Sequence, residues 1–74
     1  MANSFDFWRL RGRIKNTGYS IKSLAENIGM AYWTLCQRLN GSLDFQSSEI
    51  AKICEVLGIP DAEIPEYFFV RKIS

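Results

Sequence analysis

Apolar residues recur every three or four positions through the first part of the chain, a spacing typical of one face of an α-helix. Two such series each precede a glycine: Phe7, Leu10 and Ile14 before Gly18, and Ile21, Leu24, Ala25 and Ile28 before Gly29. Ser20 stands just before the second series and is a residue type that caps helix N-termini. The pattern therefore predicts one helix that ends near Asn16 and a second, of about nine residues, that begins after Ser20.

The helical spacing continues to the C-terminal part of the chain. Two further series are Leu35 and Leu39 before Asn40-Gly41, and Ile50, Ile53, Cys54 and Leu57 before Gly58. Ser47 or Ser48 is expected to cap the second of these helices. A short helical turn is predicted from Pro60 to Ile64, and residues 67–70 fit either a helix end or an extended segment. No alternation of apolar and polar residues competes with this period, so we predict an all-α fold.

The stretch from Ser20 to Gly41, SIKSLAENIGMAYWTLCQRLNG, has the features of two helices that cross through a short turn. Ala25 is small enough for the helices to approach each other. Gly29 tolerates the positive φ that such a turn requires. Leu24, Ile28, Met30 and Leu35 supply a small apolar core between the helices. The stretch therefore predicts a helix-turn-helix unit over residues 20–41.

This unit resembles the helix-turn-helix of the lambdoid phage repressor and Cro family, in which Leu-Ala, three residues, Gly, an apolar residue, Thr-Leu and a closing Asn-Gly recur. The segments LRGRIKNTGYS and EIPEYFF also look like small prophage-encoded regulators. The resemblance implies one compact five-helix, repressor-like domain over residues 1–74. It also implies a sequence-specific transcriptional regulator, repressor or Cro-like, that binds a double-stranded DNA operator.

The resemblance further implies which residues contact DNA. The second helix of the unit would lie in the major groove, where amides pair with adenine and apolar groups contact thymine methyls. Its base-reading positions are Ala31, Tyr32, Trp33 and Gln37. Phosphates would be held by Ser20, Lys22, Arg38, Asn40 and Ser42. Each has an alternative role: Trp33 could pack in the core, Gln37 could be an inert surface residue, and Ser20 is also a helix cap.

The charges are unevenly distributed although the net charge is only +1. Six basic and two acidic residues lie between Met1 and Gly41, which gives +4, whereas three basic and six acidic residues follow, which gives −3. Such asymmetry suggests that one face meets an anionic partner. The alternative is that the basic residues at positions 9, 11, 13 and 15 merely solvate a helix.

The composition argues against several other functions. The chain has no histidine and only two cysteines, Cys36 and Cys54, so we expect no metal site. It shows no nucleophile motif and no glycine-rich phosphate loop, so we expect neither an enzyme nor a cofactor or small-molecule substrate. No apolar run reaches the roughly 20 residues of a membrane span, and the start MANSFDFWRL does not resemble a signal peptide. We therefore expect a cytoplasmic protein with reduced cysteines.

Regulators of this class usually read two half-sites as a symmetric pair. We expect a homodimer, at least on DNA, formed through the aromatic run Tyr67, Phe68, Phe69 and Val70. In the alternative, Phe68 or Phe69 closes the core of the monomer instead. A second function is also compatible with the fold: a protein-binding module, antirepressor-like, that engages another regulator in place of DNA. The low net charge favours this second function.

Overall fold

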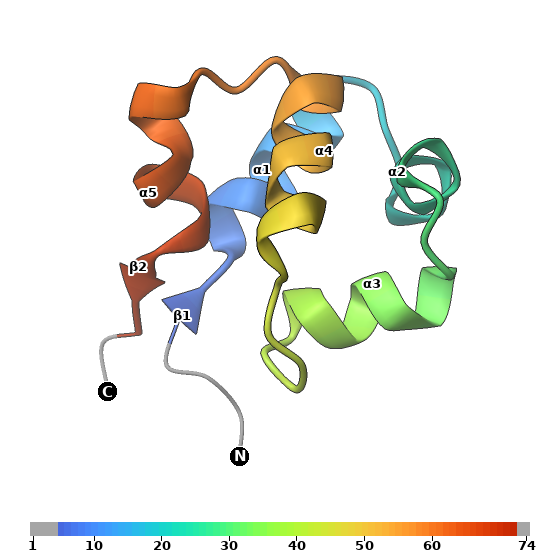
Figure 1. Ribbon diagram of the computed structural model, residues 1–74, viewed down its shortest axis with the longest axis horizontal. Coiled ribbons are helices and arrows are strands. Elements are labelled where there is room, and N and C mark those ends of the chain that lie inside the picture. The colour runs from blue at the N-terminus through green and yellow to red at the C-terminus, as the bar shows by residue number, and fades with distance from the viewer. Residues whose placement is uncertain (1–4, 73–74) are drawn as a thin grey trace.

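The computed structural model describes residues 5–72 and contains five α-helices (Figure 1). They are α1 (Trp8–Asn16), α2 (Ile21–Ile28), α3 (Tyr32–Leu39), α4 (Ser47–Leu57) and α5 (Ile64–Phe68), with a 3₁₀ turn η1 (Asp61–Glu63) before α5. The predicted all-helical, five-helix fold is thus confirmed. The sequence did not predict the two short strands β1 (Phe5–Asp6) and β2 (Val70–Arg71), which pair antiparallel and bring the two ends of the described chain side by side.

The hydrophobic core is built mostly from the residues that the helical spacing singled out, although Ile59 was not among them and the predicted Ile21, Met30 and Ile50 are only partly buried. Its buried members come from every helix and from the flanking turns: Phe7, Leu10, Ile14, Leu24, Ala25, Ile28, Leu35, Leu39, Ile53, Cys54, Leu57, Ile59 and Phe68. No polar or charged side chain among residues 5–72 is buried. Burial of this apolar surface is the main force that holds the short helices together, since isolated helices of this length are unstable in water.

Helix α2 begins as predicted, whereas α4 begins one residue early. The Ser20 hydroxyl accepts a hydrogen bond from the Ser23 amide at 3.0 Å, and the Ser23 hydroxyl accepts one from the Ser20 amide at 2.9 Å. This reciprocal pair satisfies two amides at the start of α2. In α4 the prediction that Ser47 or Ser48 caps the helix is wrong, because Gln46 is the N-cap and its amide donates to the Glu49 carboxylate at 2.8 Å.

The turn between α2 and α3 follows the helix-turn-helix prediction. Gly29 ends α2 with φ at +71°, a conformation that costs other residue types more than glycine. The Met30 amide then donates to the Ala25 carbonyl at 2.9 Å, and Ala31 is the extended N-cap of α3 without a capping side chain. Helices α2 and α3 pack against each other, and they run in clearly different directions in Figure 1. The turn thus directs α3 along one edge of the molecule.

The C-terminal segment combines both conformations that the sequence left open. Helix α5 carries Pro65 in its first turn, where a missing amide donor is tolerated, and strand β2 follows directly. Phe68 is buried in the monomer, where the Phe45 ring lies edge-on between Phe7, at 5.1 Å, and Phe68, at 5.2 Å between centroids. Phe68 therefore closes the core of the monomer. This agrees with the alternative prediction for Phe68 and not with a place in a dimer interface.

Candidate binding surface

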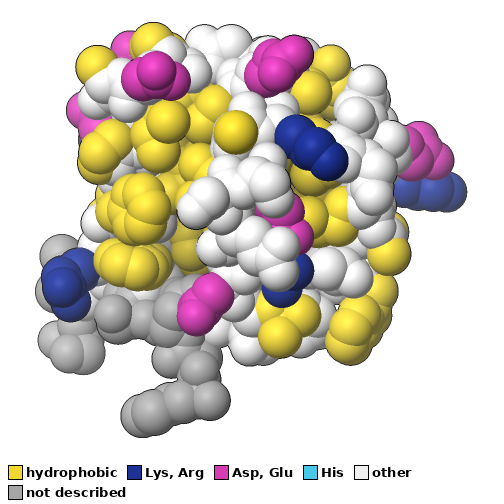
Figure 2. Space-filling model, in the orientation of Figure 1, with side chains coloured by type: hydrophobic (Ala, Val, Ile, Leu, Met, Phe, Trp, Pro, Cys, Tyr) yellow, Lys and Arg dark blue, Asp and Glu magenta, His cyan; other side chains and the backbone are white. Residues whose placement is uncertain are grey.

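The N-terminal end of α3 presents two large aromatic side chains to solvent. Tyr32 is 55% exposed and Trp33 is 67% exposed, and Ala31 beside them is exposed as well. Leu35 and Leu39 occupy the core-facing stripe of α3, which leaves Trp33 outside the core. Hydrophobic side chains are visible at the surface where α3 lies, at the lower right of Figure 2. Of the two roles considered for Trp33, the core position is wrong.

Tyr32 and Gln37 extend this surface along the helix. A side-chain hydrogen bond with Cys36, one turn further on, raises the pKa of Tyr32, so its hydroxyl is neutral at physiological pH. Gln37 is half-buried. The four predicted base-reading residues, Ala31, Tyr32, Trp33 and Gln37, all lie on α3 or its N-cap, and their contacts with DNA stay predictions.

Both cysteines are free thiols. Burial together with the charge of Asp61 raises the pKa of Cys54.

Arg38 is bound within the protein. Its Nε and Nη2 atoms donate to the two Glu49 carboxylate oxygens at 2.8 and 2.9 Å, an ion pair that joins α3 to α4. Burial raises the pKa of Glu49, but hydrogen bonds from Arg38 and the Gln46 amide, with the charges of Arg38 and Lys52, outweigh it and lower the pKa below its usual value. Arg38 therefore brings little uncompensated charge to a phosphate. Sequence reasoning missed Glu49, although a glutamate at the third position of a helix is a known capping signal.

The other predicted phosphate contacts lie at the start of α2 and after α3. Lys22 is exposed, and the Ser20 hydroxyl belongs to the cap of α2. The Asn40 side chain accepts a hydrogen bond from the Ser42 amide at 3.0 Å, which shapes the loop. Along the chain these positions lie before and after α3, and their contacts with DNA stay predictions.

The cluster of basic residues lies on α1, which packs against α5 rather than beside α3. Arg9, Arg11 and Lys15 are exposed. Arg13 is half-buried and donates to the Leu57 carbonyl at 3.0 and 3.3 Å and to the Gly58 carbonyl at 3.0 Å. A cation at these carbonyls stabilises the C-terminal end of α4. The predicted positive face and the predicted recognition helix are thus separate surfaces.

Over residues 5–72 no group of three or more side chains is arranged to hold a metal ion. No helix within the same range is long and apolar enough to cross a membrane.

Comparison with protein families and solved structures places the fold. A family described as "Protein of unknown function (DUF739)" matches residues 3–71. The chain belongs to this family. Among solved structures, this DUF739 protein is similar to the modulator of repression (MOR) of the temperate bacteriophage TP901-1 from Lactococcus lactis, a solution structure. The two chains are 30% identical, 96% of each is covered, and the TM-score is 0.77. No curated protein matches the chain.

The similarity extends over nearly the whole of both chains, so it includes α3 and its flanking turns as well as the core. The expected resemblance to a small phage regulator is confirmed at this level. Membership of the repressor and Cro family stays a prediction.

Proposed function

We propose that this DUF739 protein is a phage regulator that modulates repression by binding another regulatory protein through α3. The observation that carries the proposal is the adjacent pair Tyr32 and Trp33, which are 55% and 67% exposed at the start of the helix. Tryptophan and tyrosine dominate the residues that provide most of the energy in protein–protein interfaces. The similarity to a modulator of repression supports a role in the same kind of regulation.

The charges around α3 favour a protein partner over DNA. Protein–DNA interfaces are strongly positive because each phosphate contact needs a donor, usually Arg or Lys. Arg38 is the one basic residue of α3, and it is paired with Glu49. The main basic cluster lies on α1 instead. A surface of exposed aromatic rings with little free positive charge is the composition of an interface core between proteins.

The test measures binding to the repressor encoded by the same phage. Replacing Tyr32 and Trp33 together with alanine should weaken binding at least about 30-fold, the effect of losing roughly 2 kcal/mol. Phe69→Ala is the matched control, because Phe69 is 49% exposed but directly follows α5. Loss of binding in Phe69→Ala and not in the α3 variant would refute α3 as the binding surface. Unchanged folding is checked by thermal melts of all variants.

A DNA operator is the second candidate partner. The observation in its favour is that Ala31 and Tyr32 are exposed at the N-terminal end of the second helix of a helix-turn-helix, the end that reads bases in this motif. In this case the working form is proposed to be a homodimer on a palindromic site. Gln37→Ala should then cost about 1 to 3 kcal/mol on one operator and relax preference at one base position.

Salt dependence separates the two candidates. If DNA is the partner, affinity for duplex DNA falls steeply with salt because phosphate contacts release counterions. If a protein is the partner, binding to random duplex is weak at every salt concentration, and binding to the repressor changes little. Bound duplexes are selected from a random pool with wild type and Gln37→Ala in parallel. The same motif from both variants would refute the base-reading role of Gln37, and no motif from the wild type would refute the operator role.

A further inference from the structure

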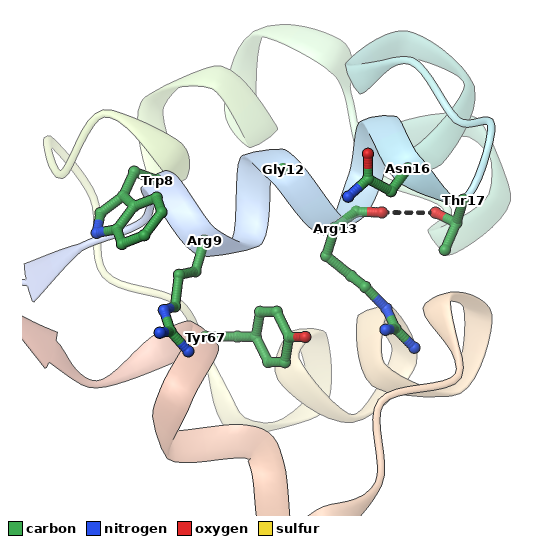
Figure 3. A pocket seen from close by; sticks show the side chains of 7 residues that line it. All are labelled: Trp8, Arg9, Gly12, Arg13, Asn16, Thr17 and Tyr67. Atoms are coloured by element: carbon green, nitrogen blue, oxygen red, sulfur yellow. Dashed lines mark hydrogen bonds between the residues drawn. The ribbon is translucent and has the colours of Figure 1, made fainter.

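A groove lies between α1 and α5, apart from the α3 surface. It encloses about 560 Å³ and is lined by Trp8, Arg9, Gly12, Arg13, Asn16, Thr17 and Tyr67. Figure 3 shows Gly12 between Trp8 and Asn16 along α1, with Arg9 and Arg13 reaching to either side of the Tyr67 ring. The groove has the size of a site for a peptide side chain or small group. The regulatory role proposed above uses none of these side chains.

Among the described residues 5–72, nothing in the packing requires position 12 to be glycine. It lies in the middle of α1, in ordinary helical conformation, where glycine is the poorest helix former after proline. A Cβ at this position would meet nothing within 4 Å. A helix position without a side chain lets another backbone or a ligand approach closely. Gly12 therefore leaves the backbone of α1 open to a partner at this point.

The polar groups of the groove indicate the charge of this partner. Its two charged lining residues, Arg9 and Arg13, are both basic. The Arg9 guanidinium lies over the Trp8 ring at 5.5 Å, which orients it, and it forms no ion pair within residues 5–72. Arg13 is bound to carbonyl oxygens, so its charge is not cancelled by an acid. A planar guanidinium beside an aromatic ring suits a carboxylate, which it binds through two parallel hydrogen bonds.

We infer that the groove between α1 and α5 binds an acidic segment of a partner protein, whose backbone passes over Gly12 and whose carboxylate pairs with Arg9. Trp8, 60% exposed, and Tyr67, half-buried, supply the apolar contact area that a phosphate backbone would not need. This inference does not depend on the role of α3, because the two surfaces are on different helices and each carries its own tryptophan.

The probe is a linear peptide selected from a random peptide library on the full-length protein. Selected peptides should be enriched in Asp and Glu. In a ¹⁵N spectrum the best peptide should shift the indole N–H of Trp8 and leave that of Trp33 in place. Selection of peptides without acidic enrichment, or a shift confined to Trp33, would overturn the inference. So would a Trp8 shift produced by duplex DNA at lower concentration than by the peptide.

Two matched variants test whether the peptide binds in the groove. Arg9→Glu should weaken peptide binding about tenfold or more, the effect of one lost charged contact. Arg11→Glu makes the same charge change on the same helix, but Arg11 does not line the groove, and its effect should be several times smaller. Equal losses in the two variants would show a general charge effect and overturn the inference.

Gly12→Ala separates binding from folding. The added methyl group should raise Tm, by about 4 °C, because alanine favours the helix and the position is open. The same methyl group should weaken peptide binding several-fold, because it stands where the partner's backbone approaches. A variant that is more stable and binds the peptide as tightly as wild type would overturn the close approach at Gly12.

Discussion

Two pairs of adjacent aromatic residues differ in how far their side chains are exposed to solvent. Tyr32 and Trp33 at the start of α3 are both more than half exposed. Phe68 at the end of α5 is 1% exposed, and Phe69 is 49% exposed, with one edge against Phe5 at 5.5 Å between ring centroids. In sequence the two pairs look equally available for a partner.

The difference arises from what each helix packs against. The loop before α4 places the Phe45 ring between Phe7 and Phe68, so Phe68 gains a site in the core. Leu35 and Leu39 fill the position against α2, and no such site is left for Trp33. Phe68 thus contributes to folding, whereas both residues of the pair on α3 remain available for recognition.

The largest expected effect tests this contrast directly. Phe68→Ala should lower the free energy of unfolding by about 3 to 5 kcal/mol, because it leaves a cavity in a fully packed core. Trp33→Ala should change it by less than about 0.5 kcal/mol, as for other exposed positions. Urea denaturation of the two variants measures both. Similar losses in the two would contradict the assignment of Phe68 to folding and Trp33 to recognition.

The turn that presents α3 provides a second test. Gly29→Val should cost about 1 to 3 kcal/mol, because a β-branched residue is strained at φ +71°. A Cβ there meets nothing within 4 Å, so the cost is backbone strain and not a clash. Thermal melts should show a lower Tm for Gly29→Val and a higher Tm for Gly12→Ala. A Gly29→Val melt that coincides with that of wild type would contradict the prediction that the positive φ at this position strains valine.

The Arg38–Glu49 ion pair gives an effect that depends on pH. The pKa of Glu49 is lower in the folded protein than its usual value of 4.5, so the ion pair stabilises the fold above that value. This contribution, about 1 kcal/mol, should be lost as pH falls from there through the depressed pKa of the folded state. Urea denaturation at pH 7 and at pH 3 measures it. Glu49→Gln should already have a lower free energy of unfolding at pH 7, and it should lack this part of the pH dependence. An unchanged pH profile would contradict the assignment of this pH dependence to the Arg38–Glu49 ion pair.

The smallest expected effect concerns self-association. Of the predicted interface residues, Phe69 is exposed and Tyr67 and Val70 are half-buried, so a dimer formed here would rest mainly on Phe69. Phe69→Ser should leave the monomer folded and weaken the proposed dimer on a palindromic duplex. Analytical ultracentrifugation with and without that duplex is the measurement. Strict 1:1 binding of the wild type at saturating protein would contradict the dimer.

Much of the fold follows from local patterns in the sequence. The spacing of Leu24, Ile28 and Leu35 and the cap at Ser20 place α2 and α3, because helical period and capping depend on residues within one or two turns. Gly29 was predicted for the same reason, since a positive φ is a property of one residue and its neighbours. The error at the start of α4 was also local, because the Glu49 carboxylate holds the amide of Gln46 and so moves the helix start by one residue.

The candidate sites were predictable only in part. The sequence placed Tyr32 and Trp33 on the second helix of a helix-turn-helix, but it left the burial of Trp33 open. It treated Arg38 as a phosphate contact, whereas the fold brings Glu49, eleven positions away, into an ion pair with it. It offered no reason to connect Gly12 with Tyr67, which only the packing of α1 on α5 brings into one groove.

The sequence by itself determined the helices, the cap at Ser20, the turn at Gly29 and the apolar stripes, because each depends on contacts between residues close along the chain. The tertiary structure alone decided which aromatic residues are buried, which cations keep an uncompensated charge, and that the basic cluster and α3 lie on different surfaces. These properties depend on pairs such as Phe7 and Phe45, or Arg13 and Leu57, that are far apart in the sequence. Their contacts are set by how the helices pack, and helical spacing carries no information about the partner of each exposed or buried side chain.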